Sequence, residues 1–246
     1  MKKVYLILGA SSDIGRQFIK LLDDDGEDLI VLAQYNNSKI LIDELQRDIK
    51  NIKIIPICCD LSDNIQVEAM IKNIKETYNS PTHILHLAAD KLEYIKYNKI
   101  DWDRMKRSFE IQLHSIIEIT KVFLPIMAKS KKGKVVFMIS SCTLGVPPKH
   151  MIQYVIVKYS LLGLMKGLAS EYAEKGININ GLSSGMIETK FLDNIDERLV
   201  EINAESTTLK RNVKISEAVN CIKFLMSESS DYMNGVNLNL TGGDIM

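Results

Sequence analysis

Short apolar segments alternate with longer amphipathic ones along the whole chain. Strands that are hydrophobic on both faces and separated by helices are typical of a parallel sheet covered on two sides. The pattern therefore predicts a doubly wound α/β fold of about seven strands with right-handed crossovers. The expected strands cover residues 4–8, 29–33, 52–59, 83–88, 135–139, 178–182 and 236–240. The expected helices cover residues 14–22, a stretch ending near 49, and 65–78, 101–128, 154–174 and 215–227.

Length and charge narrow the classes of protein to consider. The 246 residues suit one domain with a sizeable core, and no repeat, linker or low-complexity segment divides them, so we predict a single domain over 1–246. Lys+Arg and Asp+Glu both number 31, so no bulk charge favours nucleic acid or an anionic membrane as a partner. No stretch is expected to be long enough to cross a bilayer.

The four cysteines and four histidines show no metal-ligand spacing and no disulfide framework. We therefore expect no metal site. A reduced, cytoplasmic protein is the simplest interpretation of this cysteine usage.

A glycine loop, L-G-A-S-S-D-I-G, follows the first expected strand. Gly9 and Gly15 lie at a strand–turn–helix junction, where the backbone needs freedom and must approach a phosphate closely. The next helix would direct its first N–H groups at a pyrophosphate. The loop therefore predicts dinucleotide binding.

This loop resembles the T-G-x-x-x-G-x-G fingerprint of the short-chain dehydrogenase/reductase family, with Leu8 in place of threonine and Asp13 in place of the middle glycine. The similarity continues through CCDLS, HLAA, MISS, LSSGMIET and the C-terminal NGVNLNLTGGDIM. It implies an NAD(P)(H)-dependent oxidoreductase that transfers a hydride between nicotinamide and a carbonyl or alcohol, similar to 3-oxoacyl-[acyl-carrier-protein] reductases. It also implies a homodimer or homotetramer, paired through the helices at 101–128 and 154–174.

Two segments, YNNSK and YVIVK, place a lysine four residues after a tyrosine. Only Tyr154 also has a serine, Ser141, thirteen residues before it, and the resemblance makes Ser141, Tyr154 and Lys158 the catalytic group. Tyrosine and lysine at this spacing share one helix face, so the ammonium can approach the phenol. At about 5 Å the charge would lower the usual tyrosine pKa of about 10 by roughly two units, which suits a general acid or base.

The resemblance implies further roles around this group. Ser141 would hydrogen-bond the substrate oxygen, and Lys158 would also hold the nicotinamide ribose. Gln112 replaces the family asparagine that helps to hold a water chain. The implied cofactor-binding residues are Gly9, Ser11, Ser12, Asp13, Ile14, Gly15, Tyr35, Asn36, Asp60, Leu61, Ala88, Ala89, Tyr154, Lys158, Gly185, Ile187 and Thr189.

The end of the second strand bears on the cofactor. An acidic residue there would bind the ribose hydroxyls of NAD and repel the phosphate of NADP. None is present through Lys39, which favours NADP(H) and leaves NAD(H) open.

The residues around the expected substrate pocket indicate a class of substrate. Residues 143–148, Met186 and 191–211 are expected to form an apolar pocket and a lid for a carbonyl compound. Lys132 and Lys175 match basic positions where an acidic carrier protein docks on similar reductases, so an acyl thioester is one expected substrate.

Two alternative functions use the same fold. A nucleotide-sugar epimerase would need a further C-terminal domain. A non-catalytic dinucleotide-binding sensor or assembly protein of the same fold stays open, given the changes at Asp13, 86–89 and Gln112.

Overall fold

The seven strands form one parallel sheet in the computed structural model, which describes residues 2–26 and 28–244. The strand order is β3-β2-β1-β4-β5-β6-β7, so the chain changes direction across the sheet between β1 and β4. A crevice for ligands is expected outside the carboxyl ends of the strands at this point. The predicted doubly wound sheet is therefore confirmed. Its strands are β1 (Lys3–Leu8), β2 (Leu29–Tyr35), β3 (Lys53–Cys58), β4 (His83–His86), β5 (Gly133–Met138), β6 (Ile177–Ser184) and β7 (Asn237–Leu240).

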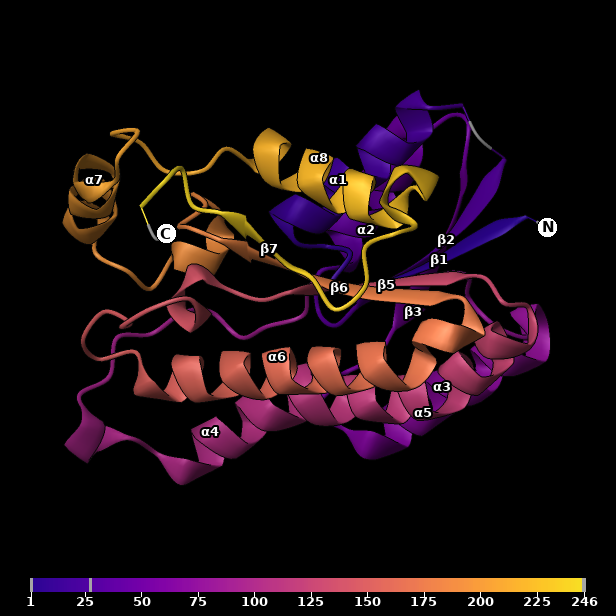
Figure 1. Cartoon of the computed structure of the whole chain (residues 1–246), viewed down its shortest axis with the longest axis horizontal. Coiled ribbons are helices and arrows are strands. Elements are labelled where there is room, and N and C mark those ends of the chain that lie inside the picture. Colours follow the sequence, from indigo (N-terminus) through magenta and orange to yellow (C-terminus); the bar gives the residue numbers. More distant parts are fainter. Residues whose placement is uncertain (1, 27, 245–246) are drawn as a thin grey trace.

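Helices cover both faces of the sheet, and one helix stands apart at the carboxyl edge of the strands (Figure 1). The first face carries α1 (Asp13–Asp24), α2 (Lys39–Asp48) and α8 (Ile215–Met226). The second carries α3 (Asn64–Tyr78), α4 (Trp102–Phe109), α5 (Ser115–Lys129) and α6 (Ile152–Tyr172). The separate helix is α7 (Glu197–Ser206), which the sequence did not predict.

Alternation along β1 explains why the core has two halves. Leu6 and Leu8 belong to the apolar cluster under α3, α5 and α6, whereas Tyr5 and Ile7 belong to the cluster under α1, α2 and α8. Successive side chains of a strand point to opposite faces, so a strand buried on both sides must be apolar at every position.

The long helix expected at 101–128 is interrupted by a π-helical turn at Glu110–His114, between α4 and α5. Over Trp102–Lys129 it is long and apolar enough to cross a membrane, with a mean hydropathy of 1.3, so the expectation that no stretch reaches that length is wrong. Phe123 and Leu124 are fully buried in the core beneath it, as in a core helix of a folded domain.

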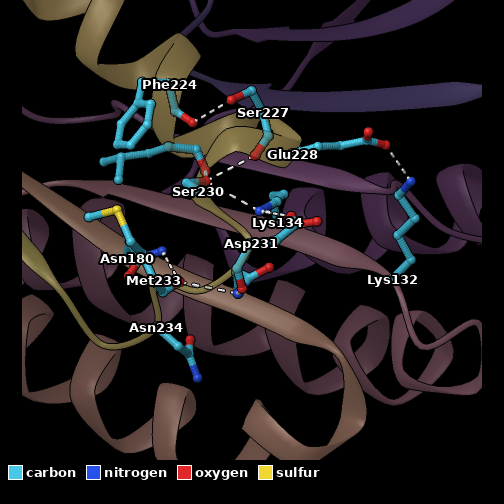
Figure 2. Close-up of polar contacts among 12 residues, drawn as sticks. Lys132, Lys134, Asn180, Phe224, Ser227, Glu228, Ser230, Asp231, Met233 and Asn234 are labelled. Atoms are coloured by element: carbon cyan, nitrogen blue, oxygen red, sulfur yellow. Dashed lines mark hydrogen bonds and ion pairs between the residues drawn. The ribbon is translucent and has the colours of Figure 1, made fainter.

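A polar network closes the amino edge of the sheet (Figure 2). The buried Lys134, on β5, donates from Nζ to Ser230 Oγ at 3.2 Å and pairs with Asp231 Oδ1 at 2.6 Å. The exposed Lys132 pairs with Glu228 at 2.9 Å. These contacts attach the segment between α8 and β7 to the start of β5, on the edge opposite the strands' carboxyl ends.

Candidate active site

One large cavity, of about 830 Å³, lies at the carboxyl ends of the strands. It extends from the glycine loop and the ends of β2 and β3 to α6 and the segment before α7. A cavity of this size lies within the usual range for ligand pockets. All the predicted site residues line it except Gly15 and Gln112.

Close backbone packing explains the two glycines of the loop. Gly9 has φ +81°, a conformation that side chains rarely adopt, and a Cβ there would lie 3.0 Å from the Ala88 amide. A Cβ on Gly15 would lie 2.7 Å from the carbonyl oxygens of Gly9 and Ala10. Gly15 therefore allows α1 to start against the loop.

Gln34 holds the glycine loop from the neighbouring strand. Its Oε1 accepts from Gly9 N at 2.8 Å, and its Nε2 donates to Cys59 O at 2.7 Å. Gln34 is buried and lines the cavity. Only the packing of β2 beside β1 shows that its amide serves the loop.

Asp13 lines the cavity and holds the segment before α7. Its Oδ1 accepts from Arg16 Nη2 at 2.6 Å, and its Oδ2 accepts from Lys190 N at 2.8 Å. The guanidinium partly offsets a charge that would otherwise oppose a bound pyrophosphate. Ser12 caps α1 instead, with its Oγ accepting from Gly15 N at 3.1 Å.

Asp60 and Arg107 form a charged pair at the end of the cavity near β3. Arg107 contacts Asp60 Oδ2 at 3.5 Å and donates to Ser62 Oγ at 2.6 Å. Burial raises the pKa of Asp60, but hydrogen bonds from Ser62 and the charge of Arg107 outweigh it and hold that pKa below its usual value. Arg107 lines the cavity and was missed, because it comes from α4, far along the chain.

These features fit a dinucleotide. The first-turn N–H groups of α1 have no acceptors within their own helix, and a helix N-terminus favours a phosphate. Gly9 provides close backbone approach, while Tyr35, Asn36 and Ser38 line the same end of the cavity.

Tyr154 and Lys158 lie on α6 at the other end of the cavity. Lys158 Nζ is 5.5 Å from the Tyr154 ring centroid and donates to Met138 O at 3.0 Å. Burial lowers the pKa of Lys158 to about 8. Burial also raises the pKa of Tyr154, so the expected lowering is wrong for the chain by itself: desolvation of the phenolate is the larger effect.

Ser140 and the predicted Ser141 both line the cavity together with Tyr154. A side-chain hydrogen bond from Ser140 lowers the pKa of Tyr154, against the larger effect of burial. Ser140 is buried just after β5, and Ser141 begins a 3-10 turn (Ser141–Thr143). The catalytic role expected of Ser141 stays a prediction, and Ser140 is a second candidate for the same role.

Gln112 lies outside the cavity, in the π-helical turn, and its Oε1 is buried with no hydrogen-bond partner among the described residues. Its main-chain oxygen lies 2.7 Å from Nε2 of the fully buried His86. A carbonyl only accepts, so Nε2 carries the hydrogen. Burial lowers the pKa of His86 to about 4.

Apolar side chains form the wall beside Tyr154. The Phe191 ring centroid is 6.1 Å from that of Tyr154, and Leu192 is buried with Leu92 and Met151. Leu144, expected here, does not line the cavity. The lining apolar residues are Leu92, Val146, Pro147, Pro148, Met151, Met186, Phe191 and Leu192.

Two predicted docking residues lie elsewhere. Lys132 and Lys175 lie just before β5 and β6, one and two residues from their first residues, at the amino edge of the sheet, and they do not line the cavity. The Lys132 ammonium pairs with Glu228, and the Lys175 ammonium lies over the Tyr172 ring. Across residues 2–26 and 28–244, no group of His, Cys, Asp or Glu side chains gathers to hold a metal ion, and all four cysteines are free thiols.

Known proteins match nearly the whole chain. A family model described as enoyl-(acyl carrier protein) reductase matches residues 9–244. The chain is 26% identical over 246 residues to 3-oxoacyl-[acyl-carrier-protein] reductase FabG of Thermotoga maritima, covering 98% of this chain and 97% of that protein. The solved structure of YwfH, an NADPH dependent reductase involved in bacilysin biosynthesis, gives a TM-score of 0.88 at 19% identity, covering 100% and 99%. A Brucella melitensis 3-oxoacyl-[acyl-carrier protein] reductase with bound NAD gives 0.84 at 21%, covering 99% and 91%.

Proposed function

The chain belongs to the short-chain dehydrogenase/reductase family of NAD(P)-dependent oxidoreductases, and from this premise we propose that it reduces an apolar ketone with NADPH. The observation that carries the proposal is the position of Ser140, Tyr154 and Lys158 at one end of the cavity whose other end is the glycine loop. The proposed cofactor site and the proposed ketone site therefore share one cavity.

Tyr154 is the general acid. Burial keeps its hydroxyl protonated, so it donates its proton to the substrate carbonyl oxygen as negative charge develops there. Ser140 donates a hydrogen bond to the same oxygen, and Lys158 supplies positive charge beside the phenol. Bound NADPH supplies the hydride that adds to the carbonyl carbon.

The preference for NADPH rests on the charges near β2. No carboxylate stands at the end of this strand, where Tyr35, Asn36 and Ser38 line the cavity, and Arg107 adds a positive charge nearby. Lys39, expected to help, pairs with Asp43 at 2.6 Å instead. NADH is the second hydride donor that we propose, as the family uses either cofactor.

The proposed substrate is a short 3-oxoacyl thioester or a similar apolar ketone, on the strength of the apolar wall and the FabG relative. We also propose a cytoplasmic homo-oligomer that pairs through α5 and α6. The exposed Ile156 and Tyr159 on α6 support such pairing, and light scattering after size exclusion tests it.

Titration with NADPH and NADH, followed by a ketone panel that includes short 3-oxoacyl thioesters, tests the function. NADPH should bind more tightly and support reduction. Tyr154→Phe removes only the phenolic hydroxyl and should lower kcat at least about a hundredfold while the cofactor Kd changes little. Binding without turnover across the panel would instead support a sensor, and full activity in Tyr154→Phe would refute the assigned acid.

A further inference from the structure

The carboxylate of Asp13 does not cap its own helix. Asp13 is the first residue of α1, and Ser12 already caps that helix through the Gly15 amide. Both oxygens of Asp13 are nevertheless occupied, one by Arg16 and the other by the main chain of Lys190. The side chain is only 17% exposed, so this contact is part of a packed structure.

The partner of Asp13 begins the segment that encloses the substrate end. We call residues 190–212 the lid. Its first residues, Lys190 to Leu192, form a short 3-10 turn that places Phe191 beside Tyr154. Its helix, α7, has no buried residue and exposes Leu199 and Ile202. Apolar packing of the lid is therefore concentrated at its start, where Leu192 and Ile195 are buried.

Besides this apolar packing, three polar contacts join the start of the lid to other segments. Lys190 N donates to Asp13, and Phe191 O accepts from Leu92 N at 3.1 Å. Asp193 pairs with Lys91 at 2.7 Å. Two of these contacts go to the segment after β4, and only the Asp13 contact reaches the glycine loop, across 177 residues of sequence.

The same loop residues that would hold the pyrophosphate therefore also hold the lid. Ser12 and Ile14, the neighbours of Asp13, line the cavity. A diphosphate bound to this first turn would fix the backbone that carries the Asp13 carboxylate. Building on the proposed function, we propose that Asp13 is a positioning residue that couples cofactor binding to closure of the substrate lid.

Coupling of this kind has a cost in cofactor affinity. The carboxylate lies beside the site of a dianionic diphosphate, and Arg16 offsets only part of the repulsion. A neutral residue should therefore raise affinity for NADPH while loosening the lid. General destabilisation would not raise NADPH affinity, so tighter NADPH binding together with a looser lid indicates coupling.

Hydrogen exchange of the lid tests the proposal in wild type, Asp13→Ala and Asp13→Asn, with and without NADPH. Asp13→Ala should speed exchange over residues 190–206 at least fivefold without cofactor, and NADPH should bind severalfold more tightly yet slow that exchange little. Asp13→Asn keeps an acceptor oxygen, so it should retain most of the protection while also binding NADPH more tightly. It serves as the second variant if Asp13→Ala folds poorly.

Asp193→Asn is the matched control, because it removes the other side-chain contact at the start of the lid without touching the glycine loop. It should speed lid exchange while NADPH affinity and the slowing by NADPH persist. Wild-type exchange in Asp13→Ala, or full slowing by NADPH in that variant, would overturn the proposal. Failure of the proposed function would look different. If NADPH binds but no ketone is reduced, every exchange comparison can still be made. If cofactor fluorescence shows no NADPH binding to wild type, both the proposed function and the coupling are refuted.

Discussion

Two buried lysines at opposite edges of the sheet show how one residue type serves stability and chemistry. Lys134 is 5% exposed at the amino edge and meets Asp231 and Ser230 (Figure 2). Lys158 is 4% exposed at the carboxyl edge, and its ammonium donates to Met138 O. A buried charge without a counter-ion is costly, and here it is placed beside Tyr154.

Lys158 differs from Lys134 in its pKa and in the atoms that surround it. Burial lowers the pKa of Lys158 to about 8, which brings its charge change near neutral pH. In the described part of the chain, the buried atoms without a hydrogen-bond partner include His86 Nδ1 and Gln112 Oε1 near this site, besides Arg16 Nε, Gln153 Oε1 and Asn237 Oδ1. Groups with strongly shifted pKa values cluster at functional sites, which fits Lys158, whereas Lys134 has a charged and a polar partner and is structural.

Replacement of each lysine by methionine gives the largest expected contrast. Lys158→Met should lower kcat at least about a hundredfold, because Tyr154 loses the adjacent charge. Its free energy of unfolding should be unchanged or higher, since an apolar side chain replaces an unpaired charge. Lys134→Met should keep kcat within about twofold and lose about 1 kcal/mol of stability. Ketone reduction and urea denaturation measure both, and equal kinetic effects would end the distinction.

The pH dependence of stability should isolate the Lys158 charge. Its folded pKa of about 8 lies below the 10.5 of an ordinary lysine, so between these values the unfolded chain binds the proton and the folded chain does not. Stability therefore rises with pH through this window, by up to about 3 kcal/mol relative to Lys158→Met. Urea denaturation of both proteins from pH 7.5 to 10.5 measures the difference, and a constant difference would contradict the assignment.

The two adjacent serines sharpen the contrast within the carboxyl edge. Ser140→Ala should lower kcat between about tenfold and a hundredfold, because the substrate oxygen and Tyr154 lose a hydrogen-bond donor. Ser141→Ala, the matched control, should change kcat less than about threefold. Steady-state kinetics decide between them, and the reverse order would identify Ser141 as the active serine.

Asp231→Asn gives the smallest expected effect, on the amino edge alone. It leaves Lys134 buried with a neutral partner and should cost about 1 kcal/mol of unfolding free energy, since Asp231 is itself largely exposed. The nearby exposed pair offers a control: Glu228→Gln should cost less than about 0.5 kcal/mol. NADPH affinity should not change in either protein, and a loss of affinity would mean that the two edges are coupled.

Local patterns predicted most of the fold. The apolar runs gave the seven strands because a strand buried on both faces is apolar throughout, and their alternation with helices requires parallel pairing. The π-helical turn and α7 escaped prediction. The first depends on how a long helix packs over the sheet, and the second has no buried face to produce a pattern.

The sequence by itself determined the sheet, the glycine loop and the Tyr154–Lys158 pair, because each follows from neighbours within a few residues. Only the tertiary structure decided that Ser140 meets Tyr154, that Arg107 pairs with Asp60, and that Asp13 binds the lid. Those contacts join segments far apart in the chain. The pKa values also belong to this second group, since desolvation depends on everything packed around a side chain and on no single stretch of sequence.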